Sequence, residues 1–324
     1  MKKATIICLI LAVLLVAAGL GLFTVAMTAL NWDFSNLSTV RYETNIHEVS
    51  EAFTNISIDT ETADIVFVPS TDGKCRVECY EQENMTHSVT VQDGTLTVCL
   101  MDGSTPEGFI PHIGINFDIP KVMVYLPATQ YAALSLHATT GDVTVPKDFS
   151  FDSADISMTT GQIDFSASAA GLVTLNTTTG NIHAADISVG TLEFSVTTGK
   201  ITVSDVTCRG TVTADVSTGD ANITNLRCEN LRSQGSTGKI TMKNVIASDS
   251  FSIQRTTGDI TFDRCDASEI LVKTSTGDVT GSLLSEKNFI AQTNTGNVTV
   301  PRIGSGGICQ IDTSTGDIYI TLVS

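Results

Sequence analysis

Basic residues are scarce in this sequence, and aromatic residues are few. The chain of 324 residues contains 18 lysines and arginines against 35 aspartates and glutamates, so its formal net charge is −17 at pH 7. This shortage of positive charge disfavours nucleic acid and anionic lipid surfaces as partners, because both repel an acidic surface. Phenylalanine, tyrosine and tryptophan together make up 6% of the residues. The acidic surplus is typical of a soluble surface outside the cell.

Long apolar runs are equally rare, and the one that occurs, over residues 4–30, contains no charged residue. About 20 apolar residues suffice to cross a bilayer as a helix, so we predict a single transmembrane anchor helix over 4–30. Lys2 and Lys3 precede it, and basic residues favour the cytoplasmic side. We therefore expect residues 1–3 in the cytoplasm, a juxtamembrane linker over 31–45, and an extracytoplasmic C-terminal part. The alternative is a cleaved signal peptide, which has a shorter apolar region and a small-residue cleavage site.

Glycine is concentrated in one pattern, a Thr-Gly dipeptide that recurs ten times at intervals of 19 or 20 residues. A short and regular period of this kind is typical of a solenoid, in which each repeat forms one coil stacked on the previous coil. The ten glycines are Gly141, Gly161, Gly180, Gly199, Gly219, Gly238, Gly258, Gly277, Gly296 and Gly316.

Apolar and polar residues alternate on both sides of each glycine. In one repeat, Val173 and Leu175 lie seven and five residues before Gly180, and Ile182 and Ala184 lie two and four residues after it. Alternation with a period of two predicts two short strands per coil, each with one face inward. Glycine is expected at the turn between them, because it enters a left-handed conformation without steric cost.

The regular Thr-Gly repeats cover residues 131–324, and residues 46–130 carry a degenerate version of the pattern. Ala63 replaces the glycine there, and three strand-like segments follow, with Asp93-Gly94 as a strong hairpin signal. We expect this segment to form a first coil and a β-meander that cover one end. The predicted fold is all-β: a single β-solenoid of about ten to eleven coils of 19–20 residues, preceded by one N-terminal transmembrane helix.

The last strand-like segment, Ile318–Leu322, has no evident cap. An uncovered edge strand offers unpaired backbone groups to another chain. The sequence therefore predicts edge-to-edge self-association through this strand, which Ile318→Lys together with Ile320→Lys is expected to abolish.

Acidic residues recur beside the turns, but their arrangement fits neither a calcium column nor an enzyme. A calcium-binding β-roll needs a glycine-rich nonapeptide, and the repeat has one glycine per turn. Asp155 and Glu193 share one phase two coils apart, and Asp215 and Asp312 share another phase much farther apart. A glycan-cleaving β-helix needs such carboxylates paired on one face. We predict no catalytic residue, no cofactor-binding residue and no metal ligand, and hence no cofactor.

No single phase of the repeat gathers the histidines, which are His47, His87, His112, His137 and His183. Among the cysteines, Cys208 and Cys228 share a phase on adjacent coils, where either a disulfide or two small buried thiols would fit. Cys75 and Cys79 share one strand face and are expected to approach Cys99 across the meander. We predict free thiols there, because the spacing matches no common zinc pattern.

The repeated Ser/Thr-Thr-Gly-Asp-Ile/Val-Thr-Val motif behind an N-terminal apolar segment resembles a bacterial group, the putative-adhesin or toast-rack type of β-solenoid. The resemblance covers about residues 46–324, including Thr62-Ala63-Asp64. It implies an envelope protein and carries over no catalytic residue. We expect a non-catalytic, membrane-anchored binding or scaffold module whose partner is a cell-envelope glycan or a membrane protein. Two alternatives stay open: an accessory in envelope-stress sensing that acts through a membrane partner, and a glycan-active β-helix enzyme.

Overall fold

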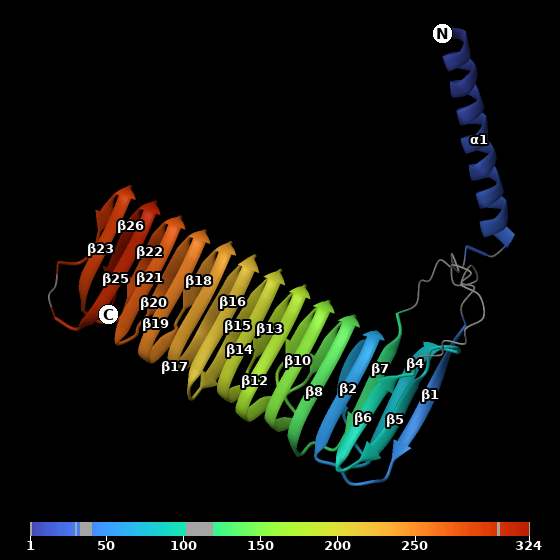
Figure 1. The fold of residues 1–324 in the computed structure, drawn as a ribbon, viewed down its shortest axis with the longest axis horizontal. Helices are drawn as coiled ribbons and strands as arrows, with labels where there is room; N and C mark the ends of the chain where they lie inside the picture. The colour runs from blue at the N-terminus through green and yellow to red at the C-terminus, as the bar shows by residue number, and fades with distance from the viewer. Residues whose placement is uncertain (1, 30, 33–40, 102–118, 303–304, 324) are drawn as a thin grey trace.

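The computed structural model describes residues 2–29, 31–32, 41–101, 119–302 and 305–323 (Figure 1). The fold is a β-solenoid of about nine turns with one N-terminal apolar helix, and most of the residues lie in strands. The predicted fold class is confirmed, but the number of turns is lower than the ten to eleven coils expected. Additional strands interrupt the first coil, and the outermost C-terminal coil has only two residues, Val298–Thr299, in its second strand.

The elements in chain order are α1 (Lys2–Ala29), β1 (Tyr42–Val49), β2 (Asn55–Thr62), β3 (Asp64–Pro69), β4 (Cys75–Gln82), β5 (His87–Gln92), β6 (Thr95–Leu100), β7 (Lys121–Leu126), β8 (Gln130–Thr140), β9 (Val143–Val145), β10 (Ser150–Thr160), β11 (Ile163–Phe165), β12 (Ser168–Thr179), β13 (Ile182–Ala185), β14 (Ser188–Thr198), β15 (Ile201–Cys208), β16 (Thr211–Thr218), β17 (Ala221–Thr237), β18 (Ile240–Lys243), β19 (Ile246–Thr257), β20 (Ile260–Cys265), β21 (Glu269–Thr276), β22 (Val279–Leu283), β23 (Lys287–Thr295), β24 (Val298–Thr299), β25 (Gly307–Thr315) and β26 (Ile318–Leu322).

The helix α1 is apolar along most of its length. Its segment Cys8–Ala29 has 22 residues and a mean hydropathy of 2.7, which makes it long and apolar enough to cross a membrane. The same length and composition fit a membrane anchor or a signal sequence.

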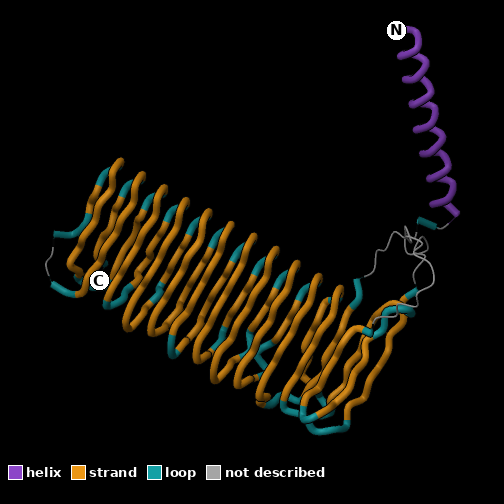
Figure 2. Tube along the Cα trace, viewed as in Figure 1, coloured by secondary structure: helices purple, strands orange, loops and turns teal. Residues whose placement is uncertain are grey.

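The regular coils form two stacks of parallel strands (Figure 2), and most coils contribute a separate strand to each stack, whereas β17 runs through both. Long strands such as β10, β12 and β14 form the long-strand stack. Short strands such as β11, β13 and β15 form the short-strand stack. Neighbouring strands pair with a shift of one repeat, so that Ile156 lies opposite Leu136 on one side and Leu175 on the other. Residues of the same phase therefore lie side by side along the solenoid.

The apolar columns predicted from the alternation lie inside the solenoid. Val173, Leu175, Ile182 and Ala184 are fully buried, and their counterparts in neighbouring coils form one continuous core with them. Full burial of one Val-, Leu- or Ile-sized side chain contributes about 2 kcal/mol. Each coil buries its apolar face against neighbouring coils, so the stack of coils is the stable unit rather than the single repeat.

Stacking explains why glycine recurs at the corner between the two stacks. Gly199 has a φ of 148°, a conformation that side chains rarely adopt. A Cβ at this position would lie 1.8 Å from the carbonyl oxygen of Gly180 in the preceding coil. The residue after the glycine links one coil to the next, as where Asp220 accepts a 2.9 Å hydrogen bond from the backbone N–H of Lys239. The carboxylates beside the turns therefore act as acceptors for backbone groups.

A second corner holds residues other than glycine in the left-handed conformation. Asparagine and aspartate tolerate this conformation better than other side chains. Asn225 donates a 2.8 Å hydrogen bond to Asp205, and Asn244 donates a 3.0 Å bond to Asn225. The sequence interpretation did not identify this column of stacked Asn and Asp residues. The residues of the column have φ values between 51° and 58° and are Asp186, Asp205, Asn225, Asn244 and Arg264.

The two C-terminal coils exchange places relative to their order in the chain. β25 pairs with β21 on one side and β23 on the other, and β26 likewise lies between β22 and β24. The prediction that Ile318–Leu322 is an uncovered edge strand is therefore wrong for Ile318 and Tyr319, which lie opposite Val298 and Thr299. The outermost described strands at this end are β23 and β24 (Figure 1). Both coils carry the Thr-Gly repeat, so the repeat pattern alone does not show which of them docks on β21 and β22.

Candidate functional site

The first end of the solenoid carries a cap of added strands, β1, β4, β5, β6 and β7. β4 lies antiparallel between β1 and β7, and β7 continues onto β3. The hairpin of β5 and β6 continues onto β2 in the long-strand stack. Asp93 and Gly94 form its turn with φ values of 50° and 72°, as the sequence predicted.

The expected meander is wrong in one respect, because its strands are divided between the two stacks. Cys75 and Cys79 lie on β4 beside β7, whereas Cys99 lies on β6 beside β2. The first coil ends in two open edges, β2 and β3, and each edge has its own covering strands. These covering strands form two small antiparallel extensions.

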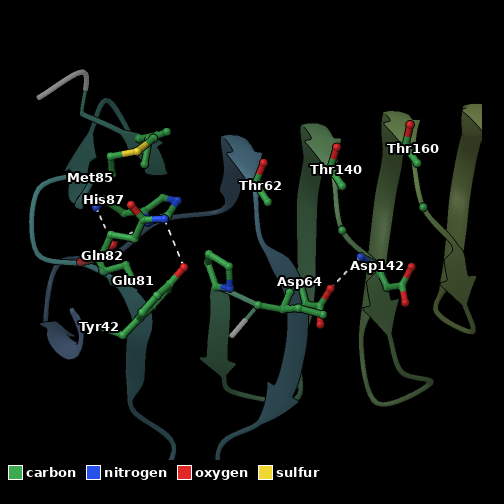
Figure 3. A pocket seen from close by; sticks show the side chains of 15 residues that line it. Tyr42, Thr62, Asp64, Glu81, Gln82, Met85, His87, Thr140, Asp142 and Thr160 are labelled. Atoms are coloured by element: carbon green, nitrogen blue, oxygen red, sulfur yellow. Dashed lines mark hydrogen bonds and ion pairs between the residues drawn. The ribbon is translucent and has the colours of Figure 1, made fainter. Parts of the chain in front are cut away.

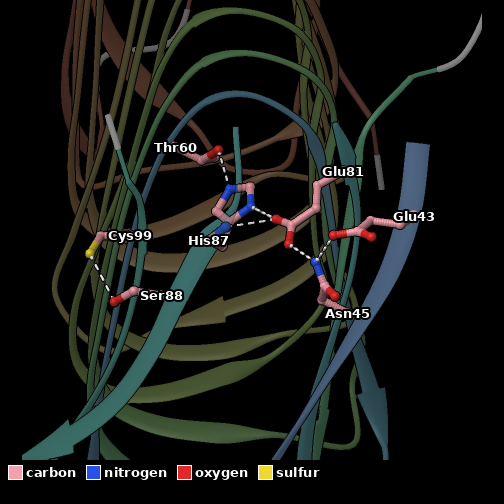
Figure 4. Close-up of polar contacts among 7 residues, drawn as sticks. All are labelled: Glu43, Asn45, Thr60, Glu81, His87, Ser88 and Cys99. Carbon is pink, nitrogen blue, oxygen red and sulfur yellow. Dashed lines mark hydrogen bonds and ion pairs between the residues drawn. The ribbon is translucent and has the colours of Figure 1, made fainter. Parts of the chain in front are cut away.

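Inside the cap, a carboxylate and an imidazole are buried together (Figure 4). Glu81 on β4 is 1% exposed and His87 on β5 is 4% exposed. Glu81 Oε2 accepts hydrogen bonds from the backbone N–H of His87 at 2.7 Å and from its Nδ1 at 2.6 Å. Glu81 Oε1 accepts a 2.8 Å bond from Asn45 Nδ2 on β1. Both carboxylate oxygens thus have the partners that a buried charge requires.

This network assigns the protons of the imidazole. A carboxylate only accepts hydrogen bonds, so His87 Nδ1 carries a proton and donates it to Glu81. His87 Nε2 lies 2.8 Å from Thr60 Oγ1. Hydroxyl, imidazole and carboxylate stand in the order that hydrolase triads use. Thr60 is only 3% exposed, so its hydroxyl is shielded from a substrate, and the three groups tie the cap to the first coil.

A pocket of about 510 Å³ opens beside Glu81 and His87 (Figure 3). The cap contributes Tyr42 and Met85 to its wall, and the first coils contribute Asp64 and Asp142. Asp64 Oδ1 accepts a 3.0 Å hydrogen bond from the backbone N–H of Asp142. The pocket thus joins the buried cluster of the cap to the beginning of the Thr-Gly corner.

A thiol, a second imidazole and the same carboxylate approach one another in the cap. The candidate ligand atoms of His47, Cys79 and Glu81 lie within 4.8 Å of one another. His47 Nε2 is buried without a hydrogen-bond partner among the described residues. Burial, and secondarily the charge of Glu81, raises the pKa of the Cys79 thiol to about 12.

The sequence interpretation missed this cluster because it lies outside the Thr-Gly repeat. Cys79 and Glu81 are two residues apart on one strand, which places both on the same face. That spacing was the available signal. The pairing of β1 with β4, which brings His47 close to Cys79, could not be inferred from that spacing and is seen only in the folded cap.

The carboxylates considered from the sequence lie on different coils. Asp155 and Glu193 both face Thr174 from neighbouring strands of the long-strand stack. This arrangement places them two strand spacings apart, or about 9.6 Å. Asp215 lies on β16 and Asp312 on β25. The absence of catalytic residues stays a prediction.

The two cysteines of adjacent coils are buried free thiols. Cys208 donates a 3.3 Å hydrogen bond from Sγ to the carbonyl oxygen of Gly190. Burial raises the pKa of the Cys228 thiol to about 12. The sequence left open a disulfide or two free thiols at this pair, and the structure contains two free thiols.

One arginine is buried within the regular solenoid. Arg255 is 4% exposed and occupies space that Gly235 leaves free, since a Cβ on Gly235 would lie 1.7 Å from Arg255 Nη1. Arg255 donates hydrogen bonds to the carbonyl oxygen of Val216 at 3.3 Å and to Ser233 Oγ at 3.4 Å. Burial lowers the pKa of Arg255, and the nearby Asp215 opposes this change. The glycine and the arginine form one local packing unit.

Comparison with known proteins identifies relatives by family and by fold. A family model described as Toastrack DUF4097 matches residues 53–223 and 209–324. No curated protein matches the chain. A solved structure of a putative adhesin from Parabacteroides merdae shares 15% identity at a TM-score of 0.50, covering 76% of this chain and 98% of that chain.

Two proteins from Parabacteroides distasonis also match. One is a putative adhesin with 15% identity and a TM-score of 0.49, covering 86% of this chain and 98% of its own. The other is a putative lipid binding protein with 18% identity and a TM-score of 0.47, covering 75% and 95%. At these identities the likeness concerns the fold alone.

Proposed function

Because the chain belongs to the Toastrack DUF4097 family, we propose that it is a non-catalytic binding or scaffold module at the bacterial cell envelope. The helix α1 anchors it in the cell membrane, with residues 1–3 in the cytoplasm and the solenoid on the outer side. An extended envelope glycan is the proposed ligand. The net charge of −17 disfavours nucleic acid and an anionic lipid surface as its partner.

The observation that carries the proposal is an uninterrupted row of threonines, which we call the Thr ladder. Each precedes a corner glycine or Ala63, and each is exposed. Figure 3 shows the first three at the ends of successive strands. Strand pairing sets about 4.8 Å between neighbours. In spatial order the ladder is Thr62, Thr140, Thr160, Thr179, Thr198, Thr218, Thr237, Thr257, Thr276, Thr315 and Thr295.

A row of this length suits an extended polymer better than a small molecule. Each hydroxyl donates one hydrogen bond and accepts others, as sugar hydroxyls do. The stacked coils hold the hydroxyls in place, so binding orders few additional groups. Many weak contacts along one polymer add to a useful affinity, because each further contact forms within an existing complex.

The test uses the full chain in detergent and purified cell-wall glycan. Thr179→Val, Thr198→Val and Thr218→Val together remove three neighbouring hydroxyls at nearly constant volume. We expect retention on the glycan to fall at least tenfold, because each lost hydrogen bond contributes about 1 kcal/mol. The matched control, on the outer face of the short-strand stack, is the triple variant Thr202→Val, Thr241→Val and Thr261→Val.

The control variant should bind as the unmodified chain does. Equal retention of all three proteins would contradict a role for the Thr ladder. Capture of one membrane protein from solubilised membranes, with no retention on glycan, would contradict glycan binding and support the stress-signalling alternative.

A further inference from the structure

We propose that the cap binds one divalent transition-metal ion of the zinc type through His47, Cys79 and Glu81. The site goes beyond the proposed binding function, because it lies among the cap strands and uses none of the Thr ladder. Imidazole nitrogen, thiolate sulfur and carboxylate oxygen are the three ligand types that zinc takes in proteins. A thiolate and an imidazole in one set favour zinc-like ions over calcium or magnesium, which prefer oxygen.

The strand register brings the three side chains to one face of the cap. β1 and β4 are antiparallel, with Asn45 opposite Cys79 and His47 opposite Val77. His47 is therefore a diagonal neighbour of Cys79, and Glu81 follows Cys79 two residues later on the same strand. Cys79 and Glu81 are fully buried, at 0% and 1% exposure, and His47 is half-buried. The cluster is inside the cap rather than on its surface.

The unpartnered imidazole nitrogen is an independent indication of a ligand. His47 Nε2 is buried without a hydrogen-bond partner among the described residues. A buried nitrogen of this kind loses its hydrogen bond to water and gains none in return. Coordination to a metal ion would supply the missing partner.

The carboxylate is held in place by hydrogen bonds from two neighbouring side chains. Glu81 accepts hydrogen bonds from His87 Nδ1 at 2.6 Å and from Asn45 Nδ2 at 2.8 Å (Figure 4). Such outer contacts fix the direction of a ligand and maintain its affinity for the metal. Asn45 and His87 are therefore positioning residues for the site.

Charge and access also fit the proposed ion. On binding, the Cys79 thiol releases its proton to solvent, so one thiolate, one carboxylate and a neutral imidazole balance a divalent cation. The three ligand atoms lie within 4.8 Å of one another, and a tetrahedral zinc site needs about 3.5 Å. Side-chain movements of about 1 Å close this gap. The pocket of about 510 Å³ is lined by Glu81, one of the three ligand residues, and lies beside the cluster.

The experiment titrates the full chain in detergent, reduced and free of chelator, with Co²⁺ as a spectroscopic substitute for zinc. We expect a thiolate-to-cobalt charge-transfer band that saturates at one ion per chain and disappears when Zn²⁺ is added. Cys79→Ser should remove the band. His47→Gln should weaken Co²⁺ binding at least tenfold, and Asn45→Ala should weaken it about tenfold through Glu81.

The matched control is Cys228→Ser. Like Cys79, Cys228 is a buried free thiol, but it lies in the regular solenoid and outside the cap. This variant should keep the band and the stoichiometry. Circular dichroism checks the fold of each variant, and the half-buried His47→Gln decides the matter if Cys79→Ser does not fold. No band in the folded unmodified chain would overturn the proposal. A band that persists without Cys79, a Co²⁺ affinity that is unchanged in His47→Gln, or a band that depends on Cys228 would overturn it as well.

Discussion

The two kinds of corner show how narrowly a single position is constrained in this fold. At the Thr-Gly corner, both the backbone conformation and the approach of the preceding carbonyl oxygen exclude a side chain, as at Gly199. At the second corner, only the backbone conformation is unusual, and Asn225 adopts it with a φ of 53°. Glycine is required where coils touch through the backbone, and Asn or Asp serves where side chains stack.

This difference predicts unequal costs for two alanine substitutions. Gly199→Ala places a Cβ 1.8 Å from the carbonyl oxygen of Gly180, so we expect the free energy of unfolding to fall by about 3 kcal/mol or more. Asn225→Ala removes a residue that tolerates the left-handed conformation, together with its hydrogen bonds to Asp205 and Asn244. We expect the free energy of unfolding to fall by about 1 kcal/mol. Urea unfolding of the two variants measures both values. Equal losses would show that close stacking is not the dominant requirement at the glycine.

At the scale of elements, the exchange of the last two coils changes which strand can meet another molecule. β26 has a neighbour on each side, and its side chains Ile318 and Ile320 are 1% and 2% exposed. β23 and β24 are outermost, and Ile290 and Val298 are 55% and 44% exposed. An outermost strand with exposed apolar side chains is the place where pairing with a second chain is expected.

Two double variants separate core from edge. Ile318→Lys with Ile320→Lys places two charges in the core, so we expect the C-terminal coils to unfold. Ile290→Lys with Val298→Lys adds charge to the edge, and should leave the unfolding free energy within about 0.5 kcal/mol of the unmodified value while reducing self-association. Light scattering and urea unfolding report the two effects. Self-association that survives the edge variant would exclude β23 and β24 as the contact.

At the scale of the whole molecule, an acidic stack of coils follows one apolar helix (Figure 1). The coils contact mainly their neighbours, and their stacking gives the solenoid long, regular faces. The function proposed for it depends on which side of a membrane those faces occupy and on whether α1 stays attached.

Membrane fractionation tests the attachment. If α1 is an uncleaved anchor, the chain stays with membranes after alkaline carbonate extraction, and its intact mass includes residues 1–32. A variant that lacks residues 1–32 should be recovered in the soluble fraction, because the remaining surface is acidic and polar. A shortened mass for the unmodified chain would instead identify α1 as a cleaved signal sequence. Protease protection of the solenoid in intact cells would contradict the predicted orientation.

The sequence alone determined the repeat, the inward columns such as Val173 and Ile182, and the glycine corners. These features are local, and the same physical requirement recurs in every coil, so the pattern is visible in the order of residues. It also determined the single apolar helix, because length and the lack of charge are sufficient for that inference.

Only the tertiary structure decided which coil is outermost and what the cap contains. β25 and β23 carry the same repeat, so the repeat pattern alone does not show which one docks on β21. The cluster of His47, Cys79, Glu81 and His87 forms because antiparallel strands bring distant residues together. The register of these strands cannot be inferred from a repeat, because the cap has none. Repeated local geometry is readable from the sequence, whereas the placement of equivalent coils and the contacts between non-repeating strands depend on packing across the whole chain.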